Sequence, residues 1–243
     1  MKIKPEYLRH SFLSLAILAA SQLTYAQNAN LKEKKIALND NAKIVYHVKD
    51  NNVKEGSYYI KSSKNDQLIV KGAYTDDKRS GNWYFYDEAG KPETVYSFQQ
   101  NKLAFIDSSL VNKLTINLPG QDKEVVENTQ IPVLLSSMNL FLSEMSNNIV
   151  IPEDHFVRNE ALPIQIKSVV DTDGEARYSV IYKHNKKTYE QPVKLTRSQF
   201  DIQWMPALYN KKPIKAEVII NTEISGSTED GNNFRRFRWG DKQ

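Results

Sequence analysis

Short segments that alternate apolar and polar residues, separated by turn-forming residues, constrain the fold of this chain most strongly. Residues 56–61 form one such aromatic segment, and residues 81–86 repeat it 25 residues later. Each segment predicts a strand, and the polar residues between them predict turns. Because one strand cannot cover its own apolar face, each unit needs a neighbour beside it. The pattern predicts a β-rich chain that begins with an antiparallel β-meander.

The aromatic residues of this region have two interpretations. They could form a surface on which a flat ligand stacks, or they could pack in the core and across neighbouring strands. The residues concerned are Tyr74, Trp83, Tyr84, Phe85 and Tyr86. Packing is the usual role of aromatic residues in such strands, and we expect it here.

The second half of the chain predicts a helix. One apolar stripe recurs at helical spacing, formed by Leu134, Met138, Phe141 and Met145. We expect the helix to begin near Thr129, with Pro132 in its first turn, and to end at Asn147 and Asn148. A stripe of this composition favours core packing over a cofactor site.

Residues 162–170 and 176–182 alternate on either side of a turn sequence, which predicts a hairpin. Gly174 stands where such a turn needs a positive φ. Asp171 and Asp173 also suggest calcium, but an EF-hand loop has its glycine at the sixth position and Gly174 is the fourth. We therefore expect a turn and no metal. A further hairpin is expected around residues 185–187, and residues 198–204 are left for a short second helix.

Residues 1–26 have the pattern of a secretory signal peptide. Lys2, Lys4 and Arg9 precede an apolar run at residues 12–20. That run is about half of the roughly twenty residues that a membrane span needs, so we expect cleavage rather than anchoring. The sequence contains no cysteine, which excludes disulfides, thiolate zinc sites and thiol catalysis. These features predict a periplasmic or secreted protein.

Positive charge is concentrated near the C-terminal end. The formal net charge is +4, of which the signal-like segment accounts for two and residues 234–243 for three, so the body is close to neutral. Nucleic-acid binding needs a broad basic surface, and we expect no nucleic-acid partner. The basic aromatic tail, residues 226–243, includes Arg235, Arg236 and Arg238. These arginines could contact an anionic membrane surface, or the tail could pack as a final strand.

The repeat region resembles the MORN-type repeat of the YwqK-like antitoxin family. Four residues match its motif: Trp83, Tyr86, Asp87 and Gly90. The first unit, with Tyr58, lacks the matching Asp and Gly. The resemblance implies that residues 27–118 form a MORN-like β-meander domain, with residues 119–128 as the linker that follows it.

Residues 129–225 resemble the C-terminal domain of TonB-type energy transducers. The motif residues occur in the order of that family: Asp171, Asp173, Gly174, Trp204, Pro206 and Pro213. Ile151 and Lys211 depart from the family pattern, which has Tyr and Gly at these places. The resemblance implies an α+β domain that combines an antiparallel sheet with one or two helices.

The same resemblance implies that the domain binds envelope proteins, such as outer-membrane receptors, by adding a partner strand to its sheet edge. The corresponding strand here comprises Ile214, Lys215, Ala216, Glu217, Val218, Ile219, Ile220 and Asn221. The tail or a second copy of the chain could instead cover this edge. Because the chain has neither the uncleaved anchor nor the Pro-rich spacer of TonB transducers, we expect binding related to TonB-type transport rather than energy transduction.

The sequence contains none of the motifs of metal-dependent, phosphate-binding or serine hydrolase sites that we sought. Glu153, Asp154 and His155 form its one local cluster of acids with an imidazole. An exported hydrolase whose site assembles in space is therefore the alternative. The main expectation is a non-enzymatic envelope protein that binds other proteins and needs no cofactor.

Overall fold

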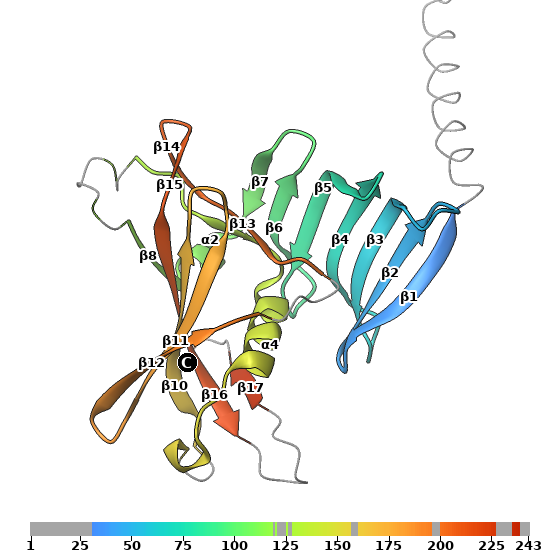
Figure 1. The fold of residues 1–243 in the computed structure, drawn as a ribbon. Coiled ribbons are helices and arrows are strands. Elements are labelled where there is room, and N and C mark those ends of the chain that lie inside the picture. The colour runs from blue at the N-terminus through green and yellow to red at the C-terminus, as the bar shows by residue number, and fades with distance from the viewer. Residues whose placement is uncertain are drawn as a thin grey trace, which may run out of the picture.

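The structure, a computed structural model, describes residues 31–118, 120, 125, 128–156, 160–195, 200–226 and 235–238. In this part the chain is β-rich, with antiparallel sheets and two α-helices (Figure 1). The predicted signal peptide and most of the predicted linker lie outside the described residues. Among the described residues, we find no helix whose length and apolar character would let it cross a membrane.

The first sheet has seven antiparallel strands, and each pairs with its neighbour in sequence. The strands are β1 (Lys32–Asn39), β2 (Ala42–Val48), β3 (Lys54–Ser62), β4 (Leu68–Thr75), β5 (Lys78–Tyr86), β6 (Pro92–Ser97) and β7 (Lys102–Ile106). Several connecting turns use Asn or Asp at positive φ, as at Asp76 and Asp77, because these side chains tolerate that conformation better than most. The predicted antiparallel meander is confirmed by this pairing.

Alternation along β5 sends its aromatic residues to opposite faces. Trp83 and Phe85 are fully buried in the core, whereas Tyr84 and Tyr86 are only half-buried. Successive residues of a strand point to opposite sides of the sheet, so the four consecutive aromatic residues of β5 divide between two surfaces. The packing interpretation therefore holds for Trp83 and Phe85, while Tyr84 and Tyr86 lie on the face away from the core.

The second sheet combines consecutive strands with two pairings between strands that are distant in sequence. Its members are β8 (Leu114–Asn117), β10 (Leu162–Val170), β11 (Ala176–His184), β12 (Lys187–Val193), β16 (Ala216–Gly226) and β17 (Arg235–Arg238). The two predicted hairpins are confirmed as β10–β11 and β11–β12. The distant pairs are β10 with β16 and β8 with β16, although β8 lies before the predicted linker. The division between the sheets thus falls before β8 rather than at residue 118, because Leu114 packs against the core of the second sheet.

Two small ribbons and short helical turns complete the fold. β9 (Val133–Leu135) pairs with β13 (Gln203–Met205), and β14 (Ala207–Tyr209) pairs with β15 (Lys212–Ile214). The helical elements are α2 (Ser108–Val111), α4 (Met138–Asn148) and the 3-10 turn η1 (Glu153–His155). The predicted second helix at 198–204 is wrong over residues 200–204, since β13 begins at Gln203 and pairs with β9; residues 198 and 199 lie outside the described part.

Helix α4 begins later than predicted. Ser137 is its N-cap, and the Ser137 hydroxyl accepts a hydrogen bond from the Leu140 N–H at 3.4 Å. The predicted start near Thr129 is wrong because Leu134 pairs with Trp204 as part of β9. Leu134 precedes Met138 by about one helical turn, so strand and helix give the same apolar spacing here. The predicted end at Asn148 is confirmed.

A buried carboxylate of the first sheet also holds the start of α4. Glu93 of β6 is 7% exposed, and its side chain accepts a hydrogen bond from the Met138 N–H. Burial raises the pKa of Glu93 to about 7, although the Met138 N–H opposes this by favouring the charged form. The contact joins the two sheets through the N-terminal turn of the helix.

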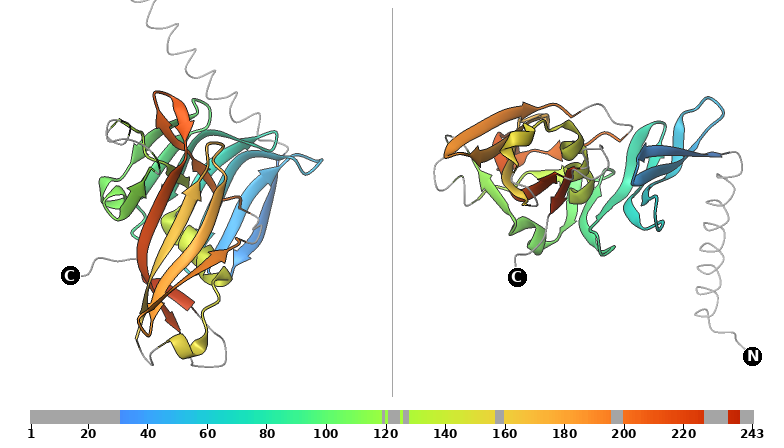
Figure 2. Two further views of the ribbon diagram at one scale, coloured as in Figure 1. Left: turned by 60° about the vertical axis from the view of Figure 1, so that its left-hand side comes forward. Right: turned by 90° about the horizontal axis from the view of Figure 1, so that it is seen from below.

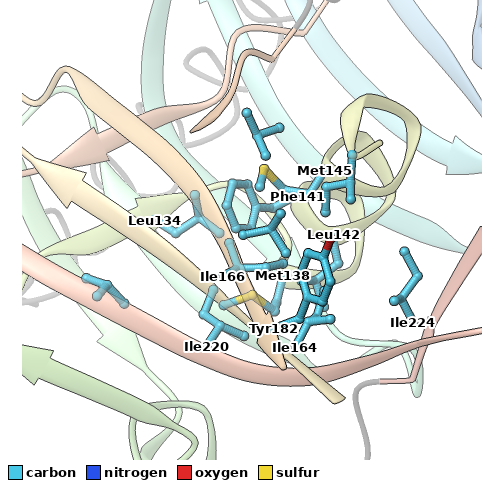
Figure 3. Packing of buried hydrophobic residues seen from close by; sticks show 14 of the residues in the cluster. Leu134, Met138, Phe141, Leu142, Met145, Ile164, Ile166, Tyr182, Ile220 and Ile224 are labelled. Carbon is cyan, nitrogen blue, oxygen red and sulfur yellow. The ribbon is translucent and has the colours of Figure 1, made fainter. Parts of the chain in front are cut away.

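The helix lies between the two sheets and contributes to two cores (Figures 1 and 2). Figure 3 shows one face of the helix packed against the second sheet; the labelled residues include Met138, Phe141, Leu142, Met145, Ile164, Ile166, Tyr182, Ile220 and Ile224. Leu140 packs in the other core, with Trp83 and Tyr58 of the first sheet. Phe200 and Met205 join that same core. The first sheet therefore buries its inner face partly against segments of the second half of the chain.

Candidate functional site

The predicted partner-binding strand lies inside its sheet. Ile214 ends β15, Lys215 connects the strands, and Ala216 to Asn221 belong to β16. One side of β16 pairs with β10 along residues 216–224. Its other side pairs with β8 over residues 217–220 and with β17 over residues 223–226. Of the two alternatives for this edge, the covered one holds over residues 217–220 and 223–226, where β8 and the tail already use the main-chain groups that a partner strand would need.

The tail contributes the backbone of β17, which contains Arg235, Arg236 and Arg238. Of the two alternatives for the tail, a final strand is the one that the pairing with β16 confirms for residues 235–238. Contact of these arginines with an anionic surface stays a prediction.

Two motifs that are separated in the sequence meet beside β11. Gly174 has φ +84° in the turn between β10 and β11, a conformation that favours glycine. A Cβ atom at this position would lie 2.5 Å from the carbonyl oxygen of Trp204. The turn can approach the Trp204 backbone this closely only with glycine. Position 174 therefore requires glycine both for its positive φ and for this close approach.

The two aspartates of the turn have structural partners. Asp171 forms ion pairs with Arg177 at 3.0 Å and with Lys215 at 3.7 Å. Asp173 accepts a hydrogen bond from the Glu175 N–H at 2.9 Å. These contacts support the turn interpretation of the motif. Within the described residues, no group of three or more His, Asp or Glu side chains has the arrangement of a metal site.

Trp204 fills the junction between this turn, the helix and β11. It is 5% exposed, and its Nε1–H donates a hydrogen bond to the Tyr178 hydroxyl at 3.1 Å. The Phe141 ring meets Trp204 edge to face, with ring centroids 6.1 Å apart. Burial raises the pKa of Tyr178 to about 12, so its hydroxyl keeps its proton at neutral pH. Pro206 follows Met205, the last residue of β13, and Pro213 lies in the exposed β15 strand.

A cleft of about 740 Å³ opens beside these motifs. We call it the acidic cleft. Helix α4, the β10–β11 turn, β11 and the segment before β14 all contribute to it. Its described lining residues are Glu144, Asp173, Gly174, Glu175, Ala176, Tyr178, Leu195, Phe200, Asp201, Ile202, Gln203 and Trp204.

Charge and apolar surface are combined in the acidic cleft. Four of the described lining residues are carboxylates, contributed by three separate segments, and none of them is lysine or arginine. Glu144 is buried, which raises the pKa of its carboxyl group, and Oε1 has a long hydrogen bond from Asn39 at 3.5 Å. Asp201 accepts a hydrogen bond from Gln203 at 2.7 Å. The cleft therefore suits a ligand group that is cationic at its tip and apolar along its stem.

Arg79 of β5 fixes one wall of the acidic cleft to the first sheet. Its guanidinium carbon lies 4.7 Å from the Trp83 ring centroid and 4.8 Å from that of Phe200. The guanidinium also donates a hydrogen bond to the carbonyl oxygen of Asp201. Sequence reasoning missed this residue, because Phe200 and Asp201 are far from Arg79 along the chain and nothing local marks the contact.

The predicted acid and imidazole cluster lies elsewhere, at the 3-10 turn η1. The His155 ring stacks on His184 with centroids 4.2 Å apart, and it lies 4.8 Å from the Tyr189 ring. Its Nδ1 is 3.0 Å from the Tyr182 hydroxyl. Glu153 and Asp154 are exposed in the same turn. The contacts of His155 are thus aromatic, and His155 is separate from the described lining of the acidic cleft.

The structure brings Asp173, Gly174 and Trp204 to one place, with Asp171 and Pro206 beside them, whereas Trp83 lies in the core of the first sheet. A comparison with protein-family models, curated proteins and solved structures finds no match to this chain. We therefore infer its function from the arrangement of its own residues.

Proposed function

We propose that this chain is a non-enzymatic, exported envelope protein that binds a basic segment of another protein in the acidic cleft. One observation supports this proposal most directly. Carboxylates from three separate segments converge with Tyr178, Phe200 and Trp204 around a cleft of about 740 Å³. The signal-peptide pattern at the N-terminus supports the location.

A lysine or arginine side chain has the chemistry that this lining would recognise. Its aliphatic stem would contact the apolar walls, while the charged end would donate hydrogen bonds to the carboxylates of Glu175 and Asp201 at the rim, both of which are exposed. An exposed ion pair contributes about 0.2–1 kcal/mol, and burial of the aliphatic stem against the apolar walls adds to it. Two such contacts would give a short basic segment measurable affinity.

We favour this mode of binding over strand addition, because β16 is paired on both sides over residues 217–220. It needs both sheets, since Arg79 holds the Phe200 and Asp201 wall in place. The MORN-like and TonB-C-like assignments of the two parts stay predictions. The proposed binding at the acidic cleft does not depend on either of them.

Fluorescence anisotropy with a labelled peptide of alternating lysine and leucine tests the proposal. We expect the double variant Glu175→Gln, Asp201→Asn to lower the affinity by about tenfold or more, because each change removes a negative charge at the rim. Raising the salt concentration should weaken the wild-type complex and narrow the difference between the two proteins.

The matched control is Glu88→Gln, which removes an exposed carboxylate from the first sheet outside the cleft. This variant should bind the peptide as the wild type does. A second control peptide carries glutamate in place of lysine and should not bind. Equal loss of affinity per charge removed in Glu88→Gln and the double variant would show that net charge, not the cleft, attracts the peptide.

A further inference from the structure

The outer face of the first sheet, which turns away from its core, carries a straight row of side chains over five adjacent strands. Directly paired residues connect β3 to β7: Tyr59 with Lys71, Lys71 with Tyr84, Tyr84 with Val95, and Val95 with Phe105. Residues that are directly opposite on paired strands point to the same face. We call Tyr59, Lys71, Tyr84, Val95 and Phe105 the outer row.

The aromatic members of the outer row are not needed to complete the core. Trp83 and Phe85, on the opposite face of β5, are fully buried, whereas Tyr59 and Tyr84 are half-buried and Phe105 is 47% exposed. Tyr86 extends the row at β5, with its ring stacked on Tyr84 at 6.5 Å. The face thus presents aromatic rings to solvent along one line.

We propose that the outer row binds an extended β-1,4-linked glycan that carries anionic groups. Tyr59, Tyr84 and Phe105 stand on every second strand, so the spacing between successive rings is about 9–10 Å. Two sugar units of an extended β-1,4-linked chain have a similar length, and every second sugar would meet a ring. An extended peptide repeats every two residues at about 6.7 Å, which does not match this spacing.

Two lysines beside the rings of the outer row favour a ligand that carries negative charge. The Lys61 ammonium lies 5.2 Å from the Tyr59 ring centroid, and the Lys71 ammonium lies 5.9 Å from that of Tyr84. Lys35 and Lys43 of the same sheet form ion pairs with Glu33 and Asp66. In the part of the chain that the structure describes, no carboxylate forms an ion pair with Lys61 or Lys71. Their charge is available for a carboxylate or phosphate group on the sugar.

The glycan site and the acidic cleft are independent of each other. The outer row lies on β3–β7, and the cleft is lined by residues 144–204. One surface offers exposed rings with positive charge, and the other offers carboxylates. Loss of peptide binding at the cleft would therefore leave glycan binding at the outer row unaffected.

Isothermal titration calorimetry with two probes tests the glycan proposal on the full chain. The probes are a carboxymethylated cello-oligosaccharide and unmodified cellohexaose. We expect the anionic probe to bind more tightly. Tyr84→Ala and Phe105→Ala should each lower its affinity by about tenfold, the change expected for one lost stacked ring. The double variant Lys61→Gln, Lys71→Gln should reduce the affinity for the anionic probe to that for the neutral one.

Phe105→Ala keeps the test decisive if Tyr84→Ala proves unstable, because Phe105 is exposed at the edge of the sheet. Tyr209→Ala, on the β14–β15 hairpin, is the matched aromatic control and should bind like the wild type. Failure of both probes to bind, or equal binding by every variant, would overturn the proposal. So would preferential binding to phosphatidylglycerol vesicles, which would make the face a lipid-binding surface.

Discussion

The two sheets differ in how far apart their paired strands lie in the sequence. In the first sheet every strand pairs with its sequence neighbour, whereas β16 of the second sheet pairs with β8, β10 and β17. Local pairing fixes which face each residue occupies, and the alternating pattern shows this directly. Pairing between strands that are distant in sequence determines which strands lie at the edge of the sheet. The local alternation of apolar and polar residues does not indicate these edges.

The sheets also depend on each other. Leu140, Phe200 and Met205 from the second half of the chain are buried in the core of the first sheet. Glu93 of the first sheet holds the start of α4. The two sheets therefore differ in topology, but this does not mean that each is stable without the other. Substitutions in each sheet can test whether the two unfold together.

The largest expected effect comes from removing the central tryptophan of either core. Trp83 and Trp204 are both buried, and replacing a buried tryptophan by alanine costs about 3–5 kcal/mol. If the sheets unfold together, Trp83→Ala and Trp204→Ala should each lower the midpoint of one shared transition in urea. Circular dichroism can follow that transition. Two separate transitions, of which each variant shifts only one, would contradict the coupling.

A proline in β16 should have the next largest effect. Glu217 pairs with Val169 of β10 and with Asn117 of β8, so Glu217→Pro should lower the free energy of unfolding by about 3 kcal/mol or more. Strand β12 lies at the end of the sheet. Because adjacent amides point in opposite directions, one of Glu190→Pro and Gln191→Pro should be clearly milder. Equal costs for all three variants would contradict the assignment of β12 as the edge.

A smaller, pH-dependent effect is expected at Glu93. The pKa of Glu93 is about 7 in the folded protein and about 4.5 in the unfolded chain, so protonation favours folding. This contribution is fully present below pH 4.5 and is lost as the pH rises through 7. We expect the loss to be on the order of 2–3 kcal/mol.

Glu93→Gln should flatten this part of the stability profile between pH 5 and 8, since the amide oxygen can still accept from the Met138 N–H. Urea denaturation at several pH values measures the profile. Glu88→Gln, at an exposed position, should leave it unchanged. A Glu93→Gln profile as steep as that of the wild type would assign the pH dependence to other groups.

The smallest effect compares two glycines, one from each sheet. Gly81 and Gly174 both have positive φ, but a Cβ at Gly81 would meet nothing within 4 Å. Gly81→Ala should therefore report backbone strain alone, about 1 kcal/mol. Gly174→Ala should cost about 1–2 kcal/mol more, because its Cβ would press on the Trp204 carbonyl oxygen. Thermal or urea unfolding measures both, and equal costs would show that the turn can move away from Trp204.

Predictions from the sequence succeeded where local chemistry decides the structure. The Gly174 turn and the strands around it are examples, because turn residues and alternation lie within one short segment. The start of α4 was misplaced, since Leu134 has helical spacing to Met138 but forms a strand with Trp204. That pairing depends on residues far along the chain.

The binding surfaces were harder to predict for the same reason. The sequence grouped Trp83, Tyr84 and Phe85 together, although the strand places Tyr84 on the other face. The acidic cleft needs Glu144, Asp173 and Asp201 in one place, and each belongs to a different element. The sequence left open whether the edge of β16 is free, because β8, which covers it over residues 217–220, comes from a part attributed to the first domain.

The pairing of β8 with β16 also has a consequence for the order in which the molecule can be completed. As the chain emerges from the ribosome, all strands of the first sheet are present once Ile106 has appeared. β8 follows within a few residues, but its partner begins only at Ala216. Closing such a long loop slows folding, because contacts between distant residues form late. We therefore expect the second sheet to form last, and the core of the first sheet to be complete only once Leu140, Phe200 and Met205 have been added to it.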